Sequence, residues 1–161
     1  MSEKELYSDD NQSVQNDLEK ISARLADNAP DKHALFLSEN DFKTVYTFFI
    51  RFMARFDITA CRIMFKLKPS AEDLSPEGFD KLVESFGKNA VVILRKSDMI
   101  MQPKKNEFLL LLPGVKEKKA DVIIRRILDT FDKIPGSEKV SIVVIFEIVT
   151  PDDSNPNDLG E

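Results

Sequence analysis

Arg95 and Asp98 are the residues whose types and spacing most suggest chemistry, because a guanidinium and a carboxylate lie three positions apart. Arginine offers several N–H donors in a fixed fork, whereas an ionised carboxylate only accepts hydrogen bonds. Together the two side chains could hold a ligand that carries both donors and acceptors. Arg and Asp at this spacing are also commonly a weak surface ion pair, so both interpretations stay open at this point.

The residues that follow Asp98 predict a β-hairpin. Met99 to Gln102 is a short apolar run, residues 103–106 (PKKN) form a turn cluster, and Phe108 to Leu112 is an unbroken apolar run. Pro113 and Gly114 then end the apolar run. Apolar runs bounded by turn residues are typical of strands, and the unbroken run indicates a second strand that is buried on both faces.

Five further segments have the periodicity of a regular element. They are a helix over residues 38–56, a strand over 59–68, a helix over 76–94, a helix over 120–131 and a strand over 140–149. With the hairpin, this order predicts an α+β fold in which helices pack on a mainly antiparallel central sheet. Phe48 and Ile50 lie off the apolar stripe of the first helix, which leaves open a second apolar contact there, with a second copy of the chain or with a neighbouring helix.

The net charge of −5 is unevenly distributed along the 161 residues. Residues 1–31 carry −5 and residues 150–161 carry −4, so the residues between them carry +4. We expect an acidic, partly disordered segment with a possible short helix over residues 1–31, a folded domain over 32–150 and a disordered acidic tail over 151–161. The acidic ends are solvating segments or interaction arms.

Several classes of function are excluded by composition. One cysteine, Cys61, allows neither an internal disulfide nor a cysteine metal cluster, and one histidine, His33, allows neither a histidine triad nor a histidine metal site. The weakly basic central region gives thin support for nucleic-acid binding. No run of about 18 apolar residues and no signal-peptide pattern are found, so we expect a cytoplasmic protein without membrane insertion.

The stretch from Arg95 to Leu112 resembles the signature hairpin of GGDEF domains, the diguanylate cyclase family. In that family an R-x-x-D motif is followed after five residues by G-G-D/E-E-F and then by an apolar strand. The frame is kept here, but the signature reads KKNEF: Lys104, Lys105, Asn106, Glu107 and Phe108. The resemblance implies a palm-like, nucleotide cyclase-like fold over roughly Asp41 to Val149, truncated at the C-terminus. It also places Asp80 where the family has its guanine-recognising aspartate.

The departures from the family pattern concern catalysis. Lys104 and Lys105 replace the two glycines that let the hairpin backbone approach the nucleotide phosphates. Asn106 replaces an acidic residue that helps to hold magnesium, and Lys66 stands where the resemblance implies the aspartate that completes the metal site. Glu107 alone cannot hold two magnesium ions. We therefore expect a catalytically inactive domain that uses no metal and no cofactor.

Two functions remain open for such a domain. The first is a regulatory protein-interaction module, whose partner is another signalling protein or a second copy of the chain. The second, which the resemblance implies, is a receptor that binds cyclic di-GMP through the R-x-x-D motif. Arg95 and Asp98 would then contact the ligand, with Arg126 or Arg125 as an auxiliary.

The lysines of the altered hairpin allow one more hypothesis. Lys66, Lys68, Lys104 and Lys105 could converge around the former catalytic pocket and receive a phosphate or an acidic segment. The alternative is that the turn lysines are solvated and that Lys66 pairs with Glu107, in place of the charge of a metal. This ion pair is a prediction that fails if the two charged groups lie more than about 6 Å apart.

Overall fold

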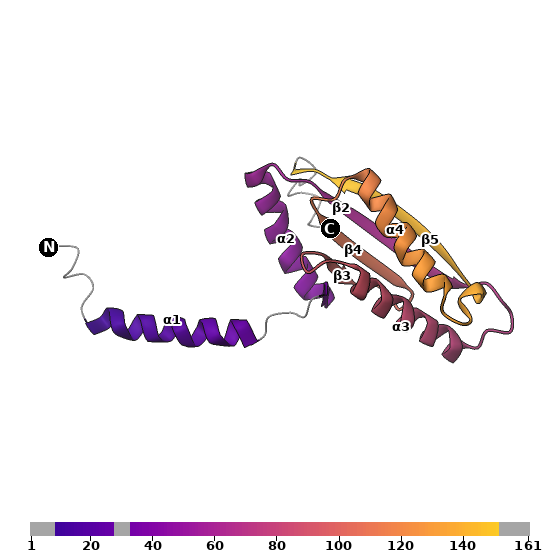
Figure 1. Ribbon diagram of the computed structural model, residues 1–161, viewed down its shortest axis with the longest axis horizontal. Coiled ribbons are helices and arrows are strands. Elements are labelled where there is room, and N and C mark those ends of the chain that lie inside the picture. The colour runs from indigo at the N-terminus through magenta and orange to yellow at the C-terminus, as the bar shows by residue number, and fades with distance from the viewer. Residues whose placement is uncertain (1–8, 28–32, 152–161) are drawn as a thin grey trace. The chain divides into compact units, whose positions relative to one another are not determined.

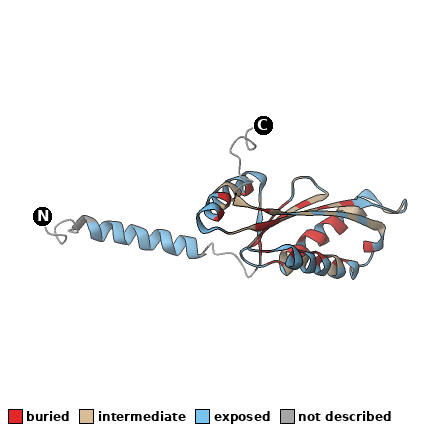
Figure 2. Cartoon of the chain, turned by 90° about the horizontal axis from the view of Figure 1, so that it is seen from above, coloured by how far each residue is buried: buried red, intermediate tan, exposed pale blue. Residues whose placement is uncertain are grey.

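The computed structural model describes residues 9–27 and 33–151 of the chain. Contacts within the chain divide it into two units, Met1–Asp31 and Lys32–Glu161. The described part of the first unit is helix α1 (Asp9–Asp27), which is longer than the short helix expected. Its apolar stripe is exposed (Figure 2) and consists of Val14, Leu18, Ile21 and Leu25. Apart from Pro151, the predicted acidic tail lies outside the described residues.

The second unit is built on a five-stranded sheet with the order β1-β3-β4-β2-β5 (Figure 1). The strands are β1 (Leu35–Leu37), β2 (Ala60–Pro69), β3 (Met99–Met101), β4 (Glu107–Pro113) and β5 (Val140–Val149). Neighbouring strands are antiparallel except for the parallel pair of β1 and β3. The predicted sheet is therefore confirmed. Strand β1 was missed, because three residues are too few to show a periodic pattern.

Helices cover both faces of this sheet. Helix α2 (Glu39–Phe56) packs on one face, while α3 (Pro76–Ile93) and α4 (Glu117–Asp132) pack on the other, and a short 3-10 helix, η1 (Ser137–Lys139), leads into β5. Strand β4 supplies Phe108 and Leu110 to the core under α3 and α4, and Leu111 to the core under α2. It is buried on both faces, as its unbroken apolar run predicts. No helix in the described ranges is both long and apolar enough to cross a membrane.

Helix α2 begins close to the predicted position, and one residue of its buried face differs from the expectation. The Ser38 hydroxyl accepts a hydrogen bond from the Asp41 N–H at 3.2 Å. Ile50, expected off the apolar stripe, is buried in the core with Met53, whereas Phe48, also expected off the stripe, is 66% exposed. The prediction for Ile50 was wrong, because a stripe crowded with phenylalanines does not reveal which arc of the helix the sheet will cover.

A glycine in helix α3 allows the helix to pack closely against β4. Its N-terminus is capped by Ser75, and the helix continues without interruption to Ile93, as expected. A Cβ atom at Gly87 would lie 2.8 Å from Cε1 of Phe108, closer than two carbon atoms can approach. Phe108 is itself buried at 1% exposure and packs at 5.3 Å, between ring centroids, from Phe86. Gly87 therefore permits the close contact between the helix and the strand that carries Glu107.

We predict that Gly87→Val destabilises the domain by about 1–3 kcal/mol, because the added methyl groups force the Phe108 ring out of a close-packed position. Lys88→Val is the matched control, since it places the same β-branched residue at the next, exposed position of α3. Urea unfolding of the full chain measures both variants. Equal stability of the two would contradict the tight packing at Gly87.

Candidate functional site

The first site to consider is the end of the β2 and β4 pair, where the altered hairpin meets the sheet. Lys66 lies directly opposite Glu107 in the antiparallel register of these strands. The Lys66 ammonium lies 3.6 Å from the Glu107 carboxylate, so the predicted ion pair is confirmed. The side chain of Glu107 is largely shielded, at 13% exposure, while that of Lys66 is 42% exposed. The strand pairing alone brings the two charges together.

The turn before Glu107 is tied to its surroundings by three side-chain contacts. The Gln102 amide donates a hydrogen bond to the Lys105 carbonyl at 2.6 Å, and the Asn106 amide donates one to the Leu67 carbonyl at 2.9 Å. The Lys105 ammonium lies 2.7 Å from the Asp80 carboxylate of α3. The Lys105 side chain is 72% exposed, so it is solvated as the alternative hypothesis expects, and it also forms a surface ion pair with Asp80. Asn106 stabilises the turn through its amide group, which a carboxylate could not do as a donor.

A hollow of about 590 Å³ lies beside this turn. Most of its lining is apolar, with polar groups from α3 and the turn at its rim, and the residues include Val83, Gly87, Val91, Phe108, Asp80 and Lys105. Asp80, which the resemblance aligns with a guanine-recognising aspartate, does face this hollow. One oxygen of its carboxylate accepts a hydrogen bond from Lys105, so a base at this carboxylate would have to share it with the lysine.

The groups around the hairpin do not fit the magnesium ions that the fold resemblance implies. Mg²⁺ requires an octahedral set of oxygen ligands, with carboxylates to offset its charge. Lys66 places a cation at one of the implied ligand positions, and Asn106 has its amide turned to a backbone carbonyl. In the part of the chain that the structure describes, no cluster of three or more His, Cys, Asp or Glu side chains could hold a metal.

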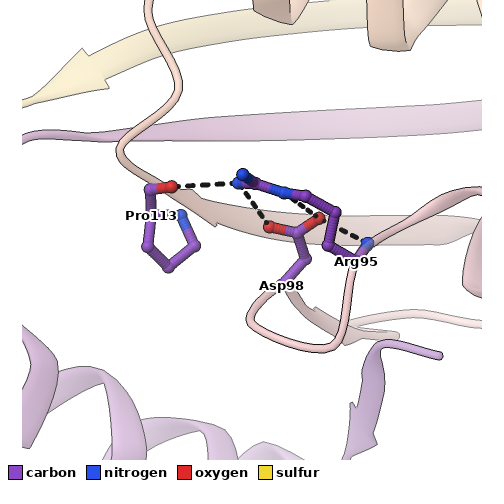
Figure 3. A network of polar contacts seen from close by, with 3 residues as sticks. All are labelled: Arg95, Asp98 and Pro113. Atoms are coloured by element: carbon purple, nitrogen blue, oxygen red, sulfur yellow. Dashed lines mark hydrogen bonds and ion pairs between the residues drawn. The ribbon is translucent and has the colours of Figure 1, made fainter. Parts of the chain in front are cut away.

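Arg95 and Asp98 form a compact network in the turn between α3 and β3 (Figure 3). The Asp98 carboxylate accepts a hydrogen bond from the Arg95 backbone N–H at 2.8 Å and another from the Arg95 guanidinium at 3.2 Å. The same guanidinium donates to the Pro113 carbonyl, at the end of β4, at 3.0 Å. Asp98 is 1% exposed and the Arg95 side chain 51% exposed, so this is a partly buried pair and not the fully exposed surface pair considered from the sequence. It ties the turn to the end of the hairpin.

A smaller hollow, of about 200 Å³, brings the sequence-predicted ligand residues together. Arg95, Asp98 and Arg126 all line it, and α4 also contributes Lys119, which sequence reasoning missed. Lys119 precedes Arg126 by seven residues, two helical turns, so its position on the same helix face could have been inferred. Arg125, the other auxiliary considered, instead pairs with Asp121 on the exposed side of α4.

Cys61, the single thiol of the chain, takes no part in either hollow. It is fully buried in β2, and burial raises the pKa of its thiol to about 11. The thiolate is the reactive form of cysteine, so the side chain stays protonated and inert at neutral pH.

Comparison with solved structures relates this architecture to a known fold. The chain is similar to a DGC protein from Thermotoga maritima, with 16% identity over 73% of this chain and 82% of that one and a TM-score of 0.59. It is similar to the Pseudomonas aeruginosa diguanylate cyclase SiaD, solved with its activator SiaC, with 15% identity over 90% of this chain and 59% of that one and a TM-score of 0.65.

A third similar structure is the coiled coil and GGDEF domain of Caulobacter crescentus DgcB in complex with c-di-GMP. It shows 10% identity over 94% of this chain and 85% of that one, with a TM-score of 0.61. No protein-family model matches the chain, and no curated protein matches it. The fold is that of the GGDEF domains of diguanylate cyclases, as the resemblance of the hairpin implied.

We predict that Arg95→Ala destabilises the domain by about 1–3 kcal/mol, because it leaves a buried carboxylate without its guanidinium donor. Arg125→Ala is the matched control. It breaks an ion pair of the same 3.2 Å length whose side chains are 75% and 54% exposed, and should cost less than about 0.5 kcal/mol. Urea unfolding of the full chain measures both changes, and similar losses would argue against a structural role of the Arg95 and Asp98 network.

Proposed function

We propose that this chain is a catalytically inactive GGDEF-fold domain that regulates signalling by binding another protein. The observation that carries the proposal is the ion pair of Lys66 and Glu107 at 3.6 Å. It puts an ammonium group at a position where the resemblance implies a magnesium-binding carboxylate. A fixed cation repels a divalent metal ion and neutralises the carboxylate that would attract it.

The rest of the hairpin supports the same proposal. Lys104 and Lys105 carry side chains at the two positions where the family needs glycine for a close approach of the backbone to phosphates. Lys105 also forms an ion pair with the carboxylate of Asp80. Lys66 pairs with Glu107 and Lys105 with Asp80, so each of these two carboxylates has a cationic partner without nucleotide or metal. A protein partner is a reasonable ligand for such a domain, since SiaD, which shares this fold, has been solved with a protein activator.

We predict that the purified full chain forms no cyclic di-GMP from GTP and Mg²⁺, because no described set of ligands can hold the two ions. Product formation is measured by chromatography over hours at high enzyme concentration. Glu107→Gln serves as the control for contaminating activity, since a true active site would lose turnover in this variant. Product that forms with the wild-type chain and disappears with Glu107→Gln would refute the proposal.

A receptor for cyclic di-GMP is a second candidate, favoured by the hollow that Arg95, Asp98 and Arg126 share. Arg126 and Lys119 supply positive charge for phosphate groups there. The burial of Asp98 counts against it, because both carboxylate oxygens already accept hydrogen bonds from Arg95. A guanine could reach this carboxylate only after the Arg95 side chain had moved.

Calorimetric titration with cyclic di-GMP distinguishes the two candidates. The receptor hypothesis predicts micromolar or tighter binding that weakens at least about tenfold in Arg126→Ala, since one charge-assisted contact is lost. Arg125→Ala, which changes the neighbouring arginine that pairs with Asp121, should bind like the wild type. Arg95→Ala is unsuitable as the test because it also removes a structural contact. Absence of heat at high ligand concentration would eliminate the receptor candidate.

A further inference from the structure

Strand β5 leaves one long edge of the sheet open. It is the last strand in the sheet order, and its ten residues pair with β2 along their whole length. Within the described ranges no strand pairs with its other side. The opposite edge of the sheet, β1, has only three residues. An edge strand presents unpaired backbone N–H and C=O groups that can template a further strand, and shortness is one of the ways in which proteins prevent this.

β5 lacks the features that usually protect an edge. Between Val140 and Val149 there is no proline, lysine or arginine, and the register with β2 is continuous, without a bulge. Glu147 is the one charged residue of the strand, and its carboxylate is paired with Arg62 of β2. Val143 and Ile145, on the face that α2 covers only in part, are 49% and 67% exposed. The edge is therefore long, regular and apolar.

The residues of β5 are also complementary to those of a second β5 in the antiparallel direction. Side chains directly opposite each other in an antiparallel pair share one face of the sheet. With Val144 on a two-fold axis, the apolar pairs are Val140 with Ile148, Ile142 with Phe146, and Val143 with Ile145. The remaining pair joins two polar side chains, Ser141 and Glu147. The two Glu147 carboxylates then lie at opposite ends of the interface.

Neighbouring registers that preserve the faces are worse matched. Moving the axis to Ile145 sets Val143 opposite Glu147, and moving it to Val143 sets Ser141 opposite Ile145. Each shift pairs a polar side chain with an apolar one at two symmetric places. A one-residue slip would exchange the core face and the open face of one strand. The register centred on Val144 thus keeps like side chains together on both faces.

We propose that two copies of this chain associate through their β5 strands, which pair antiparallel about a two-fold axis at Val144 and join the two sheets into one. The interface is isologous, because each strand supplies the same residues to the other. Pairing would shield Val143 and Ile145 from solvent. It would also give hydrogen-bond partners to the backbone N–H and C=O groups on the open edge of β5. The association does not depend on whether the domain turns over GTP, which is measured separately.

The oligomeric state in solution tests the proposal. The full-length wild-type chain should sediment as a dimer, and Ile145→Lys as a monomer at the same concentration, because a lysine on an edge strand opposes strand addition. Val122→Lys, on the exposed side of α4 at 63% exposure, is the matched control and should stay dimeric. Circular dichroism verifies that each variant is folded. A monomeric wild type, or a dimer that persists in Ile145→Lys, would overturn the proposal.

Cross-linking tests the register. Residues that face each other in an antiparallel pair have Cα atoms about 4.5–5.5 Å apart, within the range that a disulfide spans. Under oxidising conditions Val144→Cys should therefore form a covalent dimer, since the residue meets its own copy at the axis. Ser141→Cys, three residues away, should not, and the native Cys61 is buried in both variants. Cross-linking of Ser141→Cys in place of Val144→Cys would refute this register.

Discussion

The contact on which the second unit depends is the packing of Phe86 against three other aromatic rings. From α3, this ring lies 5.1 Å from Phe65 of β2, 5.3 Å from Phe108 of β4 and 5.3 Å from Phe131 of α4, measured between centroids. All four side chains are buried below 2% exposure. Aromatic rings at these separations add to the free energy of burial through favourable edge and offset geometries. One cluster thereby joins two helices to the two central strands.

This cluster explains why the hairpin keeps its shape while its turn departs from the family signature. Phe108 is the last residue of the KKNEF sequence. Its ring packs against Phe86 and lies in the space that Gly87 leaves by having no side chain. The residues before it lie at the edge of the core. A charged residue can replace another residue there if a neighbouring side chain balances its charge. Lys66 offsets Glu107, and Lys105 offsets Asp80. The buried residues of the hairpin maintain the fold, and the residues of its turn set the charges of the site. The turn can therefore change while the fold stays the same.

In the Arg95 and Asp98 network, residues associated with ligand binding have a structural role. A motif that the resemblance associates with ligand binding acts in this structure as a connection between the α3–β3 turn and the end of β4. A buried carboxylate must be paired to be tolerated, and Arg95 pairs it from within the same turn. Any ligand at the adjacent hollow would have to compete with this internal contact, whereas a protein partner could use surfaces that the core leaves open.

The sequence by itself determined the order and type of the main elements, because each is long enough to show its periodicity or carries a capping signal such as Ser38 or Ser75. It also predicted the pair of Lys66 and Glu107, since the resemblance supplied a strand register. Only the tertiary structure decided which arc of α2 is buried, as Ile50 shows, and that Asp98 is enclosed. Strand β1 and the contact of Lys105 with Asp80 also depend on segments distant in the sequence. Local patterns record periodicity and charge, but they do not record which surfaces meet.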